Sequence, residues 1–346
     1  MVQRVLVVGL GNMGMSHALA YARIDGYEVV GVCERRIAER KLPEALAKAR
    51  RFSKFEEALA ELKPDVVSIN TMPDTHADFA IKAMEAGAHV FVEKPMALTV
   101  ESAEKVVETA TRTNKKLVIG YILRQHPSWT KFVEIARELG TPLVFRMNLN
   151  QQSNNETWAW HKRLLNTFPP IVDCGVHYVD VMCQMTKAKP VRVHAIGAKL
   201  SDEVSLNNYG MLQVMFDDGS VGWYEAGWGP MMSETAFFVK DVIGPKGSVS
   251  IVMAETSGAV RSDDINAHTK TSQILRHYTD MSKPDERIDM SDEPDHEGLC
   301  EREQRYLLKA IQEDLDLTDH MNDGVKSLKI VLAADESIHT HQIVML

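Results

Sequence analysis

The stretch Val5-Leu6-Val7-Val8-Gly9-Leu10-Gly11-Asn12-Met13-Gly14 decides the fold of the N-terminal part of the chain. A short apolar run is followed by the spacing G-x-G-x-x-G, and a helical pattern then begins. In this setting the first glycine allows a tight turn, the second lets a pyrophosphate approach the backbone, and the third lets helix and strand pack closely. The helix N-terminus presents N–H groups to phosphates. The stretch therefore predicts a dinucleotide site at Gly9, Gly11, Asn12, Met13 and Gly14.

A carboxylate follows the second expected strand. Glu34 lies 20 residues beyond Gly14, where a carboxylate accepts hydrogen bonds from an adenosine ribose and repels a 2′-phosphate. This position favours NAD over NADP. Arg35 and Arg36 keep NADP open, because a guanidinium beside the ribose can stack on adenine or pair with a 2′-phosphate.

Apolar runs alternate with helical patterns as far as Gly120. Continuous runs rich in β-branched residues suit strands buried on both faces of a parallel sheet. The expected strands are Val5–Val8, Val29–Cys33, Val66–Ile69, His89–Val92 and Leu117–Ile119. The expected helices are Met13–Arg23, Ile37–Ala49, Phe55–Leu62, Thr75–Glu85 (ended by Gly87) and Val100–Thr113. The alternation predicts an α/β fold, a Rossmann doubly wound parallel sheet.

Longer strand-like runs replace this alternation after Gly120. The expected strands are Leu143–Asn150, Val191–Leu200, Gly210–Phe216, Val221–Trp228, Thr235–Ile243 and Ser248–Met253. The expected helices are Ser128–Leu139, Val172–Met185, Glu297–Glu313 and Gly324–Thr340, and residues 255–295 are expected to be irregular. This part predicts an α+β domain with an open, mainly antiparallel sheet. We expect a dinucleotide domain at residues 1–122, a substrate and oligomerisation domain at 123–346, and the active site between them.

Composition limits the classes of function. The 346 residues are 45% hydrophobic and carry a net charge of −9, which argues against nonspecific nucleic-acid or anionic-membrane binding. No run approaches the ~20 apolar residues of a membrane span, and the apolar run near the N-terminus is too short for a signal peptide. The four cysteines show neither disulfide nor zinc spacing, so we expect reduced thiols in a cytoplasmic protein.

Three further motifs occur in a fixed order along the chain. They are Thr71-Met72-Pro73-Asp74-Thr75-His76, Glu93-Lys94-Pro95 and Asp173-Cys174-Gly175-Val176-His177-Tyr178-Val179-Asp180. Together with the glycine-rich loop, they resemble the glucose–fructose oxidoreductase / inositol dehydrogenase (Gfo/Idh/MocA) family over almost the whole chain. One departure is Phe168-Pro169-Pro170, where the family often has glycines, and this affects the wall of the substrate pocket.

The motif residues make chemical sense in themselves. Lys94 follows a parallel strand, where open α/β sheets bind ligands, and its ammonium can stabilise a developing alkoxide. Asp173 and His177 are at i and i+4 on one helical face, so the carboxylate can orient an imidazole that takes a proton. The Asp173, His177 and Asp180 set is also compatible with a metal, but no further closely spaced ligand supports one, and we expect none.

The resemblance implies additional roles. It implies a cis bond between Lys94 and Pro95, and it implies that Glu93 tunes the lysine and that cofactor contacts come from Thr71, Pro73, His76, Glu93 and Lys94. Arg124, in the segment after Gly120, is a candidate for binding substrate hydroxyls, with an ordinary surface arginine as the alternative.

Two aromatic residues and a histidine lie in a segment that we expect to be a polar loop. Trp158 and Trp160 can form an apolar face for a sugar ring, and His161 can add a hydrogen bond. Simple packing of the tryptophans is equally compatible with the sequence.

These observations predict reversible hydride transfer between NAD, or NADP, and a secondary alcohol of a sugar, sugar derivative or inositol-like polyol. The expected catalytic residues are Lys94, Asp173 and His177, with substrate contacts from Arg124, Trp160, His161, Asp173 and His177. The resemblance leaves open whether Lys94 or His177 is the primary base. The alternatives are an NAD-dependent glycosidase or lyase that acts by transient oxidation, and a non-catalytic ligand sensor. Apolar residues at both parities in Met211–Phe216 and Ala236–Val239 predict a homodimer or homotetramer.

Overall fold

The computed structural model describes residues 1–235, 237–253, 261–264 and 271–346. The chain divides into two compact units, one of residues 1–122 and 297–325 and one of residues 123–296 and 326–346. The sequence predicted domains at residues 1–122 and 123–346, whereas residues 297–325 cluster with the first unit. No helix in the described ranges has the length and apolar character of a bilayer span.

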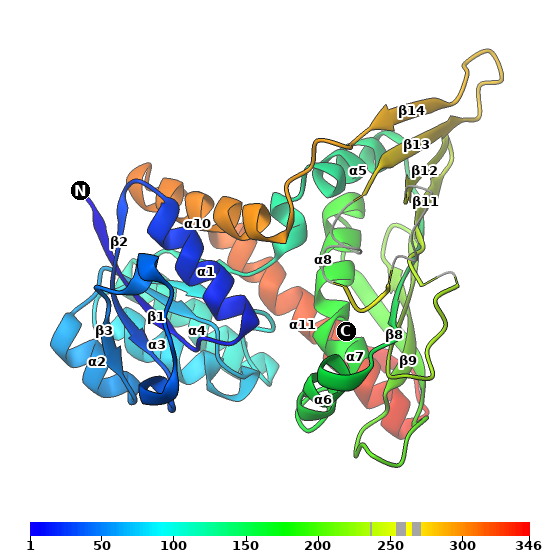
Figure 1. The fold of residues 1–346 in the computed structure, drawn as a ribbon. Helices are drawn as coiled ribbons and strands as arrows, with labels where there is room; N and C mark the ends of the chain where they lie inside the picture. Colours follow the sequence, from blue (N-terminus) through cyan, green and yellow to red (C-terminus); the bar gives the residue numbers. More distant parts are fainter. Residues whose placement is uncertain (236, 254–260, 265–270) are drawn as a thin grey trace. The chain divides into compact units, whose positions relative to one another are not determined.

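The first unit contains a six-stranded sheet in the order β3-β2-β1-β4-β5-β6, and every neighbouring pair is parallel. This order is that of a Rossmann sheet, which confirms the predicted fold. The strands are β1 (Gln3–Val8), β2 (Tyr27–Cys33), β3 (Arg50–Phe52), β4 (Val66–Ile69), β5 (His89–Val92) and β6 (Leu117–Ile119). The helices between them are α1 (Asn12–Arg23), α2 (Phe55–Leu62), α3 (His76–Glu85) and α4 (Val100–Thr113) (Figure 1).

The predicted helix Ile37–Ala49 is wrong. The segment forms two short 3-10 turns, Ile37–Glu39 and Glu44–Leu46, and the edge strand β3 follows them. Pro43 explains the difference, because it has no N–H for a helical hydrogen bond and restricts the residue before it. Helix α3, after β4, ends as predicted before Gly87, which has a φ of 96°.

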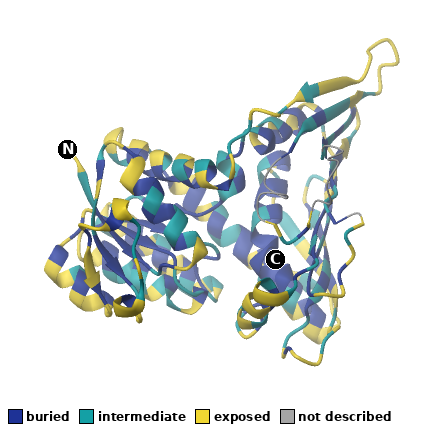
Figure 2. Cartoon of the chain, in the orientation of Figure 1, coloured by how far each residue is buried: buried dark blue, intermediate teal, exposed yellow. Residues whose placement is uncertain are grey.

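A C-terminal segment completes the core of the first unit. Helix α10 (His296–Gln312) places Leu307, Leu308 and Ala310 in the same buried cluster as Val5 and Val7. The Tyr27 hydroxyl donates to the carbonyl of Gln304 at 3.0 Å. Because these side chains cover the Rossmann sheet, residues 297–325 belong to the first unit, and Figure 2 shows the buried side of α10 in dark blue.

The described residues of the second unit form a nine-stranded sheet in the order β14-β13-β12-β11-β7-β10-β9-β8-β15. Among these strands only β7 and β10 pair in parallel, so the sheet is mainly antiparallel, as predicted. Its strands are β7 (Val144–Gln151), β8 (Pro190–Ala198), β9 (Tyr209–Phe216), β10 (Val221–Trp228), β11 (Lys240–Gly244), β12 (Gly247–Val252), β13 (Gln273–Tyr278), β14 (Glu286–Asp289) and β15 (Val344–Met345).

Two strands lie in the segment that the sequence predicted to be irregular. Strands β13 and β14 fall between residues 255 and 295, of which residues 255–260 and 265–270 lie outside the described part. β14 is a short, charged strand at the sheet edge, and such strands give little hydrophobic signal. The strand predicted at Thr235–Ile243 begins only at Lys240, and Ala236 lies outside the described residues.

Helices cover one face of this sheet. They are α5 (Pro127–Glu138), α6 (Asn155–Leu164), α7 (Pro170–Asp173), α8 (Gly175–Thr186) and the C-terminal part of α11 (Thr318–Thr340). Gly175 lets α8 approach closely, because a Cβ there would lie 3.0 Å from Val331 of α11 and 3.5 Å from the Tyr224 ring of β10. This close packing holds α8, which carries His177, in place on the sheet.

One lysine is buried beneath α8 in the sheet. Lys240 is 1% exposed, and its Nζ donates to the carbonyls of Asn148 and Val239. The same atom lies 4.8 Å from the centre of the Tyr178 ring. Burial lowers the pKa of Lys240 well below its ordinary value, so folding at neutral pH requires this amine to lose its proton or to be buried charged.

Replacing Lys240 by methionine tests this cost. Between the lowered folded pKa and the unfolded value of about 10.4, the unfolded chain binds more protons, so the native protein gains stability as pH rises. Lys240→Met has no amine to titrate, so it lacks this gain. We expect the difference in unfolding free energy, variant minus native protein, to become more negative by at least about 1 kcal/mol from pH 7 to pH 10, since each pKa unit is worth about 1.4 kcal/mol. Denaturant unfolding at both pH values measures it, and parallel pH dependences would contradict it.

Candidate active site

The glycine-rich loop has the steric properties that a dinucleotide requires. A Cβ on Gly14 would lie 1.9 Å from the carbonyl oxygen of Gly9, and a Cβ on Gly9, whose φ is 81°, would lie 2.5 Å from the carbonyl oxygen of Asn70. A Cβ on Gly11 would meet nothing within 4 Å. Gly14 therefore allows the close packing of α1 on the loop, Gly9 allows the close approach of the loop to the segment after β4, and the space over Gly11 is open for a pyrophosphate.

The N-terminus of α1 is suited to an anion. Gly11 is the N-cap and supplies no capping side chain, and the first turn contains no acidic residue. The leading N–H groups and the helix dipole are therefore directed at whatever lies over the loop. The residues present fit the diphosphate of a dinucleotide.

Glu34 lies at the end of β2, but its partner is not one of the two adjacent arginines. Arg40 donates to Glu34 Oε2 at 2.8 Å, while Arg35 and Arg36 are exposed. The Glu34 side chain is 27% exposed, so its carboxylate remains accessible for a ribose. The sequence pattern did not single out Arg40, because the 3-10 turns that bring it back to Glu34 replace an expected helix.

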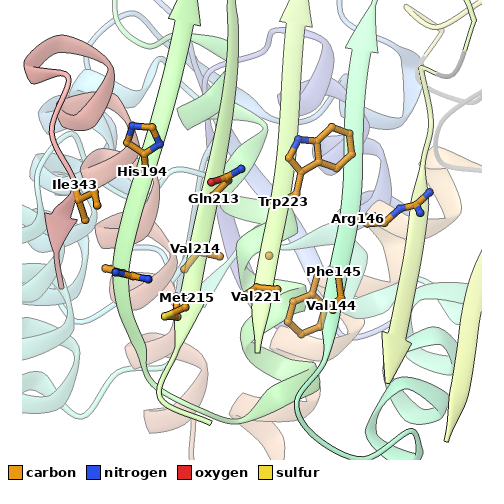
Figure 3. Close-up of a pocket in the computed structure, with 12 residues that line it drawn as sticks. Val144, Phe145, Arg146, His194, Gln213, Val214, Met215, Val221, Trp223 and Ile343 are labelled. Carbon is orange, nitrogen blue, oxygen red and sulfur yellow. The ribbon is translucent and has the colours of Figure 1, made fainter. Parts of the chain in front are cut away.

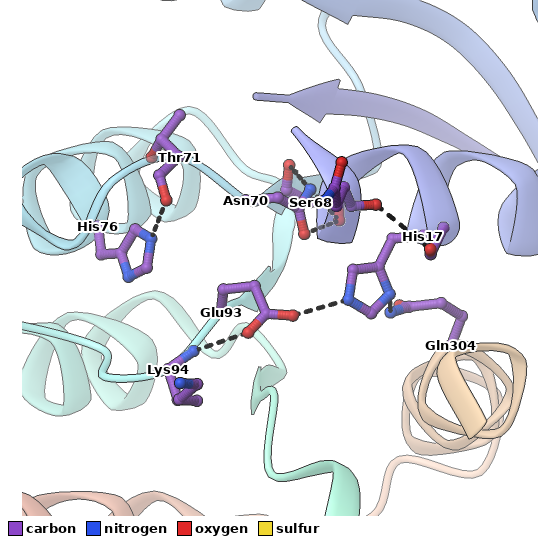
Figure 4. Close-up of polar contacts among 10 residues, drawn as sticks. His17, Ser68, Asn70, Thr71, His76, Glu93, Lys94 and Gln304 are labelled. Atoms are coloured by element: carbon purple, nitrogen blue, oxygen red, sulfur yellow. Dashed lines mark hydrogen bonds and ion pairs between the residues drawn. The ribbon is translucent and has the colours of Figure 1, made fainter. Parts of the chain in front are cut away.

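Buried partners on both sides hold the Glu93-Lys94-Pro95 turn after β5. On one side His17 Nε2 lies 2.8 Å from Glu93 Oε1, and Glu93 Oε2 accepts the Lys94 backbone N–H at 3.1 Å (Figure 4). On the other side His76 Nδ1 lies 2.8 Å from the Pro95 carbonyl oxygen. The peptide bond between Lys94 and Pro95 is cis, as the resemblance implied.

His76 also links this turn to the loop after β4. Its Nε2 lies 3.0 Å from the carbonyl oxygen of Thr71, and the residue is only 1% exposed. Burial lowers the pKa of His76, although its two carbonyl contacts oppose that shift. Thr71 and Thr75 share a hydrogen bond of 2.6 Å, and Pro73 begins the intervening turn. The alternative of a surface histidine is therefore wrong, and His76 braces the backbone around the candidate cofactor residues.

The second unit places Asp173 and His177 on a nearly continuous helix. Pro170 occupies the first turn of α7, where proline is tolerated, so Phe168-Pro169-Pro170 starts this helix cleanly. The backbone between α7 and α8 remains helical at Cys174, with φ −81° and ψ −36°. Asp173 is 7% exposed, and His177 is more exposed than the residues on either side of it. The two residues therefore lie on consecutive helices, Asp173 at the end of α7 and His177 in the first turn of α8, and the His177 N–H donates to the carbonyl of Cys174 at 3.2 Å.

Arg124 and Asp180 form an ion pair within the second unit. The Arg124 guanidinium donates from Nε at 2.9 Å and from Nη2 at 2.5 Å to the two Asp180 oxygens. Gln184 also donates to Asp180 at 2.9 Å. Asp180 is 1% exposed, so the pair ties the start of this unit to α8. This bidentate contact fixes the orientation of the Arg124 guanidinium.

The segment with the tryptophans is not a loop. Residues Asn155–Leu164 form helix α6, which buries Trp158 and His161 and leaves Trp160 45% exposed. The His161 ring stacks on Trp228 of β10, with centroids 4.4 Å apart. The predicted loop is wrong because Trp158 and His161 are at i and i+3, which places them on one helical face. The polar residues on either side of this pair hid the helical period.

Sequence reasoning missed two buried partners of the Glu93-Lys94-Pro95 turn. His17 follows Gly14 by three residues, so it lies one turn into α1, and Gln304 Nε2 contacts its Nδ1 at 2.9 Å from α10. The spacing of His17 from the glycine loop is a usable signal, but nothing in the sequence links Gln304 to it. His17 also belongs, with Cys300 and Glu303, to a buried group of ligand-type atoms within 4.8 Å of one another.

Two family models match this geometry. Residues 3–121 match the NAD-binding Rossmann fold of the GFO_IDH_MocA oxidoreductase family, and residues 135–250 match the GFO/IDH/MocA C-terminal domain. The two matches together cover more than half of the chain and agree with the resemblance found in the motifs. The chain belongs to the Gfo/Idh/MocA family of oxidoreductases, and its first unit is an NAD-binding domain.

Individual relatives differ in their substrates. The chain is 31% identical over 204 residues to UDP-N-acetylglucosamine 3-dehydrogenase of Acidithiobacillus ferrooxidans, covering 59% of this chain and 61% of that protein. It is 29% identical over 182 residues to inositol 2-dehydrogenase of Salmonella typhimurium, covering 51% and 52%. The solved structure of the Acidithiobacillus enzyme superposes with a TM-score of 0.77 at 22% identity, over 98% of this chain and 99% of that one. The structural likeness shows the shared fold.

Gly11 and Gly14 provide a matched pair of alanine substitutions. Gly14→Ala forces a Cβ against the Gly9 carbonyl, so we expect unfolding to become easier by about 3 kcal/mol or more. Gly11→Ala meets nothing in the protein, so we expect its stability to change by less than about 0.5 kcal/mol. We expect its dissociation constant for NAD to rise at least about 10-fold. Denaturant unfolding and NAD titration measure these effects, and normal NAD affinity in Gly11→Ala would contradict the assigned phosphate position.

Proposed function

We propose that this protein is an NAD-dependent dehydrogenase that oxidises a secondary alcohol of a sugar, a sugar derivative or an inositol-like polyol. The observation that carries the proposal is that Lys94, Asp173 and His177, side chains of the types that exchange protons, occur together in a chain with an NAD-binding unit. Lys94 follows a parallel strand of that unit, and Asp173 and His177 lie on the consecutive helices α7 and α8 of the second unit. The substrates of the related dehydrogenases, an inositol and a nucleotide sugar, support the chemical class.

The proposed mechanism gives each residue one role. Bound NAD supplies the hydride acceptor. His177 takes the proton of the reacting hydroxyl, while the Lys94 ammonium stabilises the alkoxide oxygen as negative charge develops. The Asp173 carboxylate orients His177 and stabilises its protonated form.

The other candidate residues have proposed binding roles. We propose that Gly9, Gly11, Asn12, Met13 and Gly14 hold the diphosphate, and that Glu34 binds the adenosine ribose with Arg35 beside it. Thr71, Pro73, His76 and Glu93 would shape the nicotinamide end. Arg124, Trp160 and His161 remain proposed substrate contacts. Among them the exposed Trp160 offers the most surface to a ligand, while Arg124 is paired with Asp180 and His161 is stacked on Trp228.

Single substitutions test the catalytic roles. We expect Lys94→Ala and His177→Ala each to lower turnover more than about 100-fold, because each loses one proton-transfer or oxyanion contact. The NAD dissociation constant should change much less. The measurement is reduced-nicotinamide absorbance with NAD or NADP and a panel of inositols, aldoses, sugar acids and nucleotide sugars.

Exposed residues serve as controls in that assay. Lys82→Ala and His339→Ala remove a surface lysine and a surface histidine and should leave turnover unchanged. Near-normal turnover in Lys94→Ala or His177→Ala would remove that residue from the mechanism. Release of an aglycone without net NADH would instead indicate the glycosidase or lyase alternative, and NAD binding without turnover on any substrate would indicate a sensor.

We propose that the outer face of the second unit's sheet joins a second copy of this chain. The face forms a groove lined by residues of four central strands, β7, β8, β9 and β10, including Trp223, Gln213 and His194 (Figure 3). It carries exposed apolar side chains, namely Val144, Ile196, Val221 and Ile343. Both charge signs occur there, with Arg146 3.5 Å from Asp241. A two-fold axis can match such a face with itself.

We also propose a cytoplasmic location, which the four buried free cysteines support.

A charge in the groove tests the assembly. We expect Trp223→Glu to convert the native dimer or tetramer to a smaller species, because the carboxylate would be buried against an apolar partner face. Light scattering coupled to gel filtration measures the mass. Met281→Glu, at a residue that is 90% exposed outside this face, is the control and should leave the mass unchanged. A monomeric native protein would contradict the proposal.

A further inference from the structure

A chain of buried contacts leads from Gln304 of α10, through His17 of α1 and Glu93, to Lys94. The amide Nε2 of Gln304 lies 2.9 Å from His17 Nδ1, His17 Nε2 lies 2.8 Å from Glu93 Oε1, and Glu93 Oε2 accepts the Lys94 backbone N–H at 3.1 Å. Figure 4 shows these contacts in line. An amide nitrogen can only donate, so His17 Nδ1 accepts and Nε2 carries the proton that is donated to Glu93.

The contacts lie in a closed environment. His17 and Gln304 are 0% exposed and Glu93 is 8% exposed. The His17 ring packs on Phe91 with centroids 4.6 Å apart. A Cβ on Gly120 would lie 3.2 Å from Glu93 Oε2, so the glycine leaves just enough room for the carboxylate. The positions of these groups are therefore set by packing as well as by hydrogen bonds.

We propose that His17 is a positioning residue for Lys94, which acts by holding the Glu93 carboxylate against the start of the Lys94 residue. The inference rests on the proposed function only in calling Lys94 catalytic. The proposed role of His17 involves no contact with substrate or cofactor, because both of its ring nitrogens contact protein side chains. Those two contacts also leave no ring nitrogen for a metal ion beside Cys300 and Glu303.

The charges around Glu93 explain why this support matters. Burial alone would raise the pKa of Glu93, but His17, Lys94 and His76 outweigh burial and lower it to about 2. Behind His17, burial and the charge of Glu93 raise the pKa of Glu303 well above its ordinary value, which favours the neutral form of Glu303. Burial also raises the pKa of Cys300, so this thiol is neutral too. Glu93 is thus the anion of the group, and His17 is its strongest partner.

Loss of His17 should therefore shift the pKa values of Glu93 and Lys94 in a definite direction. Without it, burial drives Glu93 toward its neutral form near physiological pH. Lys94 would then lose a negative neighbour, and its own pKa would fall. The carboxyl would also lose the hydrogen bond that fixes its direction, so the lysine would be held less firmly.

A substrate-free measurement tests this coupling. Lysines of the full-length protein are reductively methylated with ¹³C, and the Lys94 signal is assigned by its disappearance in Lys94→Arg. We expect His17→Leu to lower the Lys94 pKa by about one unit, since one nearby opposite charge is worth about that much. His17→Gln retains a donor near the Nε2 position and should restore most of the native value. A His17→Leu titration equal to the native one would overturn the proposal.

Turnover gives a second, independent readout. We expect His17→Leu to lower kcat at least about 10-fold and to move the acidic limb of its pH profile upward, with the NAD dissociation constant within about threefold of native. His17→Gln should recover most of kcat. Glu303→Gln contacts the same cluster but keeps a neutral group, so it controls for packing and should leave the pH profile unchanged. An equal loss of kcat at all pH values in every variant would indicate a merely structural role.

The two readouts separate the two proposals. If Lys94→Ala retains full turnover, the catalytic role of Lys94 fails, while the titration still decides whether His17 acts on Lys94 through Glu93. If Lys94→Ala is inactive and the titration is unchanged in His17→Leu, the dehydrogenase proposal stands and the positioning role is wrong. Thermal unfolding of each variant identifies any that fail to fold.

Discussion

The close approach of α1 to β1 and β4 is the constraint on which the first unit depends. It requires that residues 9 and 14 have no side chain, because a Cβ on either would lie within 2.5 Å of a carbonyl oxygen. The same approach directs the N-terminus of α1 over Gly11 and brings His17, one turn further on, to Glu93. One steric requirement therefore sets both the phosphate site and the support of the Glu93-Lys94-Pro95 turn.

Three buried ionisable side chains in the described part of the chain have different environments. Asp180 is neutralised by a bidentate guanidinium, the strongest geometry for a carboxylate. Glu93 is held ionised by a histidine and by the lysine that it supports. Lys240 has carbonyl and aromatic neighbours, and burial depresses its pKa. The first arrangement stabilises α8, the second serves the site, and the third is a cost that packing elsewhere must offset.

The sequence predicted five strands of the Rossmann sheet because they are continuous apolar runs, and the glycine spacing of the loop indicated the fold; the edge strand β3, with two arginines, was not predicted. It failed where local composition and tertiary contacts disagree. Pro43 breaks the expected helix after β2, and a charged edge strand such as β14 carries no apolar period. The sequence predicted a loop around Trp158 and His161 because few residues of helix α6 are buried, so its apolar period is weak.

For the proposed site, sequence reasoning singled out candidate ligand-binding residues more readily than the residues that support them. Lys94 and His177 belong to motifs with fixed spacing, whereas Gln304 is separated from His17 by 287 residues and meets it only because α10 returns to the first unit. A support residue of this kind needs only the right donor at the right point in space, so its position in the sequence is set by topology. The two histidines beside Lys94 illustrate the difference: His76 lies within a recognisable motif and braces backbone carbonyls, while His17 acts on a side chain. Because Glu93 is the group whose charge depends on its neighbours, His17 is the support through which a substitution alters the chemistry of Lys94 as well as its position.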